Sequence, residues 1–112
     1  MAKFEITKRK NGEFQYNLKA TNGETILTSE GYAAKASCLK GIASVKKNSV
    51  EDQRFEKRVS KNSKPFFILK AKNGQIIGTS EMYESESARD KGMASIKKNA
   101  PDAKTVDLTK EK

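Results

Sequence analysis

The sequence contains no histidine, no tryptophan and a single cysteine, Cys38, among its 112 residues. Without histidine there is no Ser-His-Asp or Cys-His nucleophile system and no histidine-ligated metal site. One thiol forms neither an internal disulfide nor a cysteine-rich zinc site, so nothing indicates an oxidising compartment. We therefore expect no cofactor and no catalytic or metal-binding residues, and we interpret Cys38 as a small buried hydrophobe on a helix face.

Long apolar runs are also missing. The N-terminal residues lack one, so no signal peptide is predicted. The other runs, such as Phe66 to Leu69, fall far short of the roughly 20 residues that a membrane-spanning helix needs. These absences predict a cytoplasmic protein that has no membrane partner. With 35% hydrophobic and 33% charged residues, the chain suits one ordinary domain with a modest core.

An internal repeat organises the chain. When the sequence is shifted by 51 positions, residues 4–54 align with residues 55–105 without a gap, and 21 of the 51 positions are identical. Such self-similarity at a fixed period indicates a duplicated structural unit. We therefore predict a single domain over residues 1–112, built from the repeats 4–54 and 55–105 and a C-terminal strand and tail.

Each copy begins with a pattern that is typical of three strands. Gly12 and Gly23 each follow an asparagine, which is a hairpin signal because both residue types tolerate the positive backbone angles of a tight turn. Between these turns, residues 14–20 alternate between apolar and polar side chains, as a half-buried strand does. In the second copy the first turn reads Asn62-Ser63, which is a weaker signal.

A helical spacing follows the third strand. One predicted helix face carries Ala34, Cys38, Ile42 and Val45. Each helix ends in Lys-Lys-Asn, where cations suit the negative end of the helix dipole. Ser85 fits the N-cap of the second helix. Beyond that helix, residues 105–108 alternate like a strand, and their spacing leaves open whether this strand pairs with its own copy or with the other.

The combination of short strands, an Asn-Gly turn, Ser-Glu-x-Tyr and a helix ending in Lys-Lys-Asn resembles the YegP-like family, small bacterial proteins of unknown function. The resemblance covers nearly the whole chain in both copies. It implies an α+β fold of two β-β-β-α-β repeats, which form one antiparallel sheet with exchanged C-terminal strands and two helices on one face. It implies no catalytic residues.

The most distinctive short motif lies between the third strand and the helix of each copy. One interpretation is functional, because loops after strands often carry binding residues. The favoured interpretation is structural: the serine and the glutamate bond free backbone N–H groups at the helix start, and the tyrosine packs over it. The motif residues are Ser29, Glu30 and Tyr32, with Ser80, Glu81 and Tyr83 in the second copy.

Lysines recur on both predicted helices, and the chain carries a net charge of +9 with a pI near 9.7. A pI this high favours nucleic acid as a partner, bound through phosphate contacts without sequence specificity. The alternative is that the lysines complement the helix dipoles and keep the protein in solution. The candidate nucleic-acid-binding residues are Lys40, Lys46, Lys47, Lys91, Lys97 and Lys98.

One sheet face differs between the copies. Where the first copy has Gln15 and Asn17, the second has Phe66 and Ile68, and Ile76 extends this apolar set. If helices cover only the other face, these three side chains form an exposed patch for a protein partner or for self-association. The alternative is that local packing or the chain tail covers them. We therefore expect a non-catalytic binding or protein-interaction module, with nucleic-acid binding through the basic helix ends as the alternative.

Overall fold

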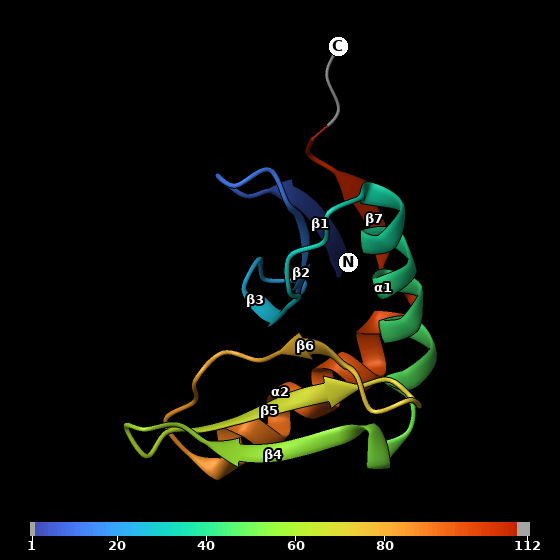
Figure 1. Cartoon of the computed structure of the whole chain (residues 1–112). Coiled ribbons are helices and arrows are strands. Elements are labelled where there is room, and N and C mark those ends of the chain that lie inside the picture. The colour runs from blue at the N-terminus through green and yellow to red at the C-terminus, as the bar shows by residue number, and fades with distance from the viewer. Residues whose placement is uncertain (1, 110–112) are drawn as a thin grey trace.

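The computed structural model describes residues 2–109, which form one seven-stranded sheet and two α-helices (Figure 1). This confirms the predicted α+β architecture. The strands are β1 (Lys3–Lys8), β2 (Phe14–Lys19), β3 (Thr25–Thr28), β4 (Phe55–Val59), β5 (Pro65–Lys70), β6 (Ile76–Thr79) and β7 (Lys104–Asp107). The helices are α1 (Lys35–Asn48) and α2 (Glu86–Asn99), which are followed by the short 3-10 helices η1 (Asp52–Arg54) and η2 (Ala100–Asp102).

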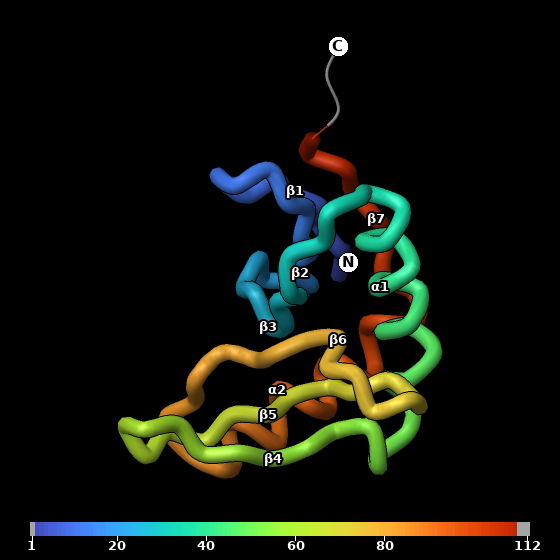
Figure 2. Tube along the Cα trace, in the orientation of Figure 1, coloured from blue at the N-terminus to red at the C-terminus, as the bar shows by residue number. Residues whose placement is uncertain are grey.

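The strand order β4-β5-β6-β3-β2-β1-β7 places each copy in one half of the sheet. The halves join where Thr28 of β3 pairs with Thr79 of β6, and they stand at a steep angle to each other (Figure 2). Each helix carries the chain across to the other half: α1 leads to the edge strand β4, and α2 leads to β7. Strand β7 runs parallel to β1, whereas the other neighbouring strands within the described residues are antiparallel.

The hairpin turns form where the sequence predicts them. Gly12, Gly23 and Gly74 adopt positive φ angles of 89°, 86° and 89°, and Ser63 adopts the same left-handed conformation at 62°. A serine pays a steric penalty there that glycine does not. The weaker signal at residues 62–63 therefore still produces the turn, but with a strained residue in it.

Both helices pack on the same face of the sheet through a glycine. A Cβ atom on Gly41 would lie 2.6 Å from the Tyr32 hydroxyl oxygen and 2.9 Å from a ring carbon of Tyr16. On Gly92 it would lie 2.2 Å from the Tyr83 hydroxyl oxygen. The two glycines thus let the helices approach the aromatic rings closely enough to pack on them. Both sit near the middle of a helix, where glycine otherwise costs stability.

The helix faces largely agree with prediction. Cys38, Ile42 and Val45 are buried, and the Ser85 hydroxyl caps α2 by accepting a bond from the Ala88 amide at 3.1 Å. Ala34, expected on the buried face of the first helix, is instead the exposed N-cap of α1.

The two halves of the core differ where they meet. The Leu27 side chain occupies the space above Gly78, since a Cβ there would lie 2.6 Å from Leu27. At the same junction the Tyr16 hydroxyl donates a hydrogen bond to the Ile77 carbonyl. Phe67 replaces Tyr16 in the second copy and has no hydroxyl to donate. At this junction the pseudo-two-fold relation between the copies therefore holds for the backbone but not for the side chains.

The expected exposed patch on the open sheet face is only partly exposed. Ile68 is 2% exposed, because it lies mid-sheet, directly between Glu56 of β4 and Thr79 of β6. Phe66 and Ile76 are half-buried. The expectation that Ile68 is accessible is therefore wrong, and the apolar surface on this face is smaller than the sequence pattern indicates.

Candidate functional site

The serine of the Ser-Glu-x-Tyr motif joins two strands. Ser29 Oγ accepts a hydrogen bond from the Tyr16 amide at 2.9 Å and donates to the carbonyl of the next residue at 2.8 Å. In the second copy Ser80 Oγ binds the Phe67 amide at 2.9 Å in the same way. Each serine hydroxyl thus accepts a bond from a strand amide, Tyr16 of β2 in the first copy and Phe67 of β5 in the second. We had expected these serines to cap the helices, which the structure does not show.

The tyrosine of the motif belongs to the core. Tyr32 stacks on Tyr16 with 6.2 Å between ring centroids and a 16° interplanar angle, and Tyr83 stacks on Phe67 at 6.2 Å and 10°. Burial is the main cause that raises the pKa of both Tyr32 and Tyr83. Both rings pack against the middle of a helix rather than over its start. The acids of the motif are exposed on the surface.

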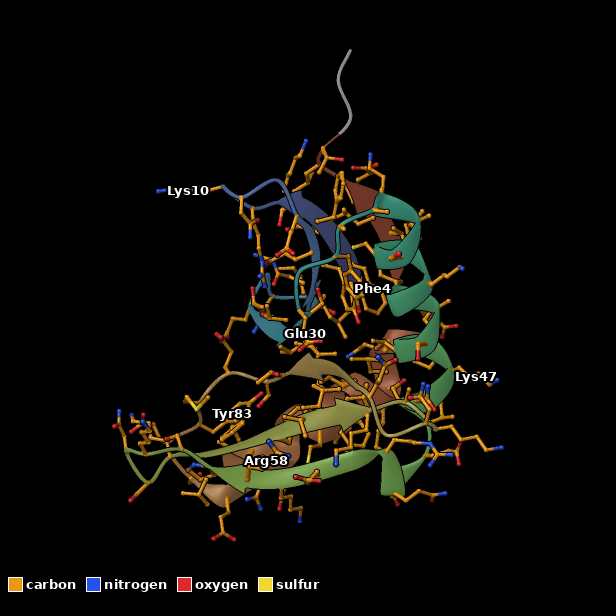
Figure 3. All side chains as sticks on the ribbon, in the orientation of Figure 1. Phe4, Lys10, Glu30, Lys47, Arg58 and Tyr83 are labelled. Carbon is orange, nitrogen blue, oxygen red and sulfur yellow. The ribbon has the colours of Figure 1, made fainter. Side chains whose placement is uncertain are left out.

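The lysines of the two helices do not form one cluster. Lys46 Nζ lies 5.9 Å from the centroid of the Phe4 ring, so its stem lies along the core. Lys97 forms an ion pair with Asp52 of η1. Figure 3 shows Lys47 projecting from α1 into solvent, whereas Phe4 lies between the sheet and the helix. Neighbouring lysines on one helix thus have different environments.

Lys40 and Lys47 line a groove of about 560 Å³ along the outer side of α1. Its other walls are the segment from α1 to β4 and the β5–β6 turn, which lies beside the second half of α1 (Figure 2). These walls add Arg54 and Lys72 as cations and Glu51 as the one acid among the lining residues. Four positive charges and one negative charge give the groove a net charge of +3.

A chain of hydrogen bonds fixes Arg54 in this groove. Its Nε donates to Asn48 Oδ1 at 3.2 Å, and its Nη2 lies 3.5 Å from Glu51 Oε1. Asn48 in turn donates through Nδ2 to the Ser44 carbonyl at 2.8 Å, which anchors the amide on α1. The Arg54 side chain is only 18% exposed. An arginine held in this way loses little conformational entropy when it binds an anion.

The groove continues into a second cavity of about 240 Å³. The two cavities share Lys40, Ser44, Ala71 and Asn73, so they form one continuous groove. This second part is lined by residues of another kind, which include Tyr32, Ser37, Gln75 and Ile77. We call the two parts the basic end and the polar end of the α1 groove.

The equivalent positions beside α2, which the repeat relates to those of the α1 groove, carry a different charge. The register of 51 residues keeps two lysines, Lys91 and Lys98, but places Thr105 at the position of Arg54 and Thr21 at that of Lys72. It also places Glu24 at the position of Gln75, and Asp102 at that of Glu51. Two positive and two negative charges sum to zero. Within residues 2–109, the set of positions that is strongly basic beside α1 is therefore neutral beside α2.

Sequence reasoning named two of the four cations and missed Arg54 and Lys72. Arg54 follows α1 through η1, and Lys72 belongs to a hairpin of the other copy, so only the topology brings them to α1. A usable signal was present, because both positions are basic in one copy and threonine in the other. Comparing the two copies for positions at which the charge differs would identify both residues.

The described part of the chain also gives findings on metal binding, on the thiol and on membrane-spanning helices. Among residues 2–109, no three His, Cys, Asp or Glu side chains lie close enough to hold a metal ion. Cys38 is buried, and burial raises the pKa of its thiol, as does the charge of Asp107 to a smaller extent. Over the same residues, neither helix has the length and apolar character needed to span a bilayer.

The fold and the groove together define a tandemly duplicated α+β protein with one basic groove. Residues 10–56 and 60–107 each match the family model described as a domain of unknown function, DUF1508. The chain belongs to this family.

Its relatives extend over nearly the same length. An uncharacterised UPF0339 protein of Acinetobacter baylyi is 57% identical over 106 residues, which are 95% of this chain and 96% of the relative. The UPF0339 protein YegP of Yersinia pestis is 50% identical over 106 residues, which are 95% of each chain. These names assign neither a reaction nor a ligand.

Two solution structures share the fold. The Escherichia coli yegP protein, of unknown function, superposes with a TM-score of 0.92 at 47% identity, covering 99% of this chain and 96% of that chain. A UPF0339 protein of Shewanella oneidensis gives a TM-score of 0.91 at 48% identity, covering 96% and 91%. The resemblance inferred from the sequence motifs is thereby confirmed.

Proposed function

We propose that the protein is a non-catalytic binding module and that the α1 groove binds the phosphate backbone of nucleic acid without sequence specificity. The observation that carries this proposal is the convergence of four cations from three separate segments around one acid. Nucleic acid occurs in the cytoplasm, and the reducing conditions there keep a free cysteine in its thiol form. We therefore place the protein there.

The arrangement of the cations favours an extended polyanion over a single small anion. Lys40 and Lys47 follow one side of α1, two helical turns apart in sequence, while Arg54 and Lys72 stand on the opposite walls. Charges distributed along a groove match phosphates repeated along a strand, and Lys and Arg contacts to phosphate supply most non-specific affinity. The fixed guanidinium of Arg54 provides paired donors for one phosphate.

Binding of a protein partner through the open sheet face has less support. Of the three residues predicted for it, Ile68 is buried, and Phe66 and Ile76 are half-buried. A docking surface needs a larger accessible apolar area than this. We therefore retain nucleic acid as the proposed ligand class.

Fluorescence anisotropy with labelled oligonucleotides tests the proposal over a salt series from about 50 to about 200 mM. The double variant Lys47→Gln, Lys72→Gln should weaken binding, and it should reduce the slope of log affinity against log salt by about 2, one for each lost phosphate contact. The matched control is Lys98→Gln with Lys91→Gln, which removes the same charge from α2.

The control separates a groove from a general charge effect. If the groove binds the strand, the α2 control keeps nearly the full affinity at each salt concentration. Equal losses in both double variants would mean that net charge alone attracts the oligonucleotide. The absence of binding at the lowest salt would overturn the proposed function.

A further inference from the structure

We infer that the α1 groove is selective for single-stranded nucleic acid, with an unpaired base held at its polar end next to the phosphates at its basic end. This inference rests on the proposed function and adds the form of the nucleic acid. It derives from the continuity of two cavities whose linings differ in chemistry.

The polar end offers hydrogen-bonding groups and little charge. It is lined by Ser37 of α1, which carries a hydroxyl, and by Gln75, the residue before β6, which carries a side-chain amide. The Gln75 side-chain oxygen lies 3.4 Å from Asn73 Nδ2, while its own Nε2 donates to no acceptor within residues 2–109. A neutral amide with free donor capacity pairs with the edge of a base and tolerates the strand's negative charge.

The size of the polar end fits one base. A cavity of about 150 Å³ is known to hold benzene, and this end measures about 240 Å³. One face of the Tyr32 ring is already stacked on Tyr16. We therefore place the base against the accessible part of the half-buried Tyr32, with its edge toward Gln75.

A duplex cannot use both ends of the groove together. Its base edges are paired and stacked inside the helix, so only phosphates reach a protein surface unless a segment enters one of the DNA grooves. A single strand can present its phosphates and an unpaired base to the same cleft, as sequence-tolerant single-strand binders require. The basic end then sets the charge dependence, and the polar end sets the preference for unpaired strands.

The equivalent position beside α2 provides an internal comparison. Glu24 stands at the position equivalent to Gln75. Glu24 is also among the charges that raise the pKa of Tyr83, after burial and Glu81, so this acid lies near the α2 tyrosine. A carboxylate there repels a phosphate strand. The neutral amide thus stands beside α1, at the basic groove, whereas the acid stands at the equivalent position beside α2.

The test compares one labelled oligonucleotide as a single strand and as a duplex of the same length, in DNA and RNA versions, at fixed low salt. We expect at least tenfold tighter binding of the single strand. Gln75→Glu should lower single-strand affinity several-fold more than Glu24→Gln changes it. Ser37→Ala, at an exposed helix position, should lower single-strand affinity and leave duplex affinity unchanged.

The outcomes separate this inference from the proposed function. Equal affinity for the single strand and the duplex, with groove lysines still required, would overturn the single-strand preference and leave the phosphate-binding function standing. An unchanged single-strand affinity in Ser37→Ala together with Gln75→Glu would also overturn the placement of a base at the polar end. No binding of either form would overturn both.

Discussion

Replacing Gly92 by alanine should lower the free energy of unfolding in the natural protein and raise it in the Tyr83→Ala variant. The new Cβ atom would lie 2.2 Å from the Tyr83 hydroxyl oxygen and 2.7 Å from the ring carbon that bears it. Both separations are well inside van der Waals contact, so the Tyr83 ring has to move away from Phe67, on which it stacks. The substitution therefore sets helix propensity against core packing at one position.

The magnitude follows from these two opposing effects. Overpacking of a well-packed core costs about 1–3 kcal/mol, while alanine is favoured over glycine inside a helix by about 1 kcal/mol. In the natural background we expect a net destabilisation of about 1 kcal/mol. When Tyr83 is also alanine, the nearest remaining atom is a Phe67 ring carbon at 3.4 Å, which is an acceptable contact. Gly92→Ala should then stabilise the helix by up to about 1 kcal/mol.

Urea unfolding of the four proteins in this double-mutant cycle measures the coupling, which should be about 2 kcal/mol. Tyr83→Phe serves as a control, because it removes the hydroxyl but leaves the 2.7 Å approach of the ring carbon. In that background Gly92→Ala should still destabilise. A change of the same sign and size in all three backgrounds would refute the packing explanation for this glycine.

Three further predictions concern a turn, an ion pair and the thiol. Ser63→Gly should raise the free energy of unfolding by about 0.5–1 kcal/mol, because Ser63 has a φ of 62°, and Gly12→Ser should lower it; thermal melts would show both shifts. The hydrogen bond from Lys35 lowers the pKa of Asp107 from 3.8 to about 2. The stability that this pair contributes should be complete above pH of about 4 and disappear as the pH falls to about 2, and urea unfolding of Asp107→Asn should lack this pH dependence. Cys38 should react with a thiol reagent at the rate of global unfolding, and fast labelling of the native protein would contradict its burial.

The sequence predicts most of the fold because local chemistry and the repeat agree. The alternation along residues 14–19 reflects one buried side of β2, and the left-handed glycines mark turns that form between the strands. The residues of β7 do not indicate which strand it pairs with. Its parallel pairing with β1 depends on α2 crossing the sheet, which spacing alone does not encode.

The candidate site was less predictable for a geometric reason. Adjacent helix positions point about 100° apart, so Lys46 lies over Phe4 while Lys47 lines the groove. Arg54 and Lys72 reach the same groove from segments that no local pattern connects with α1. Predicting them requires the tertiary contact between a helix of one copy and a hairpin of the other.

The pairing of Leu27 with Gly78 implies that the two halves are no longer interchangeable. A symmetric dimer of the first half would place two leucines at the axis, and a dimer of the second half would leave a void where both have glycine. In a homodimer every substitution occurs twice, so a protrusion and its matching recess cannot occupy equivalent positions. Covalent fusion removes that restriction, and it allows the cleft beside α1 to be cationic while the equivalent positions beside α2 are neutral.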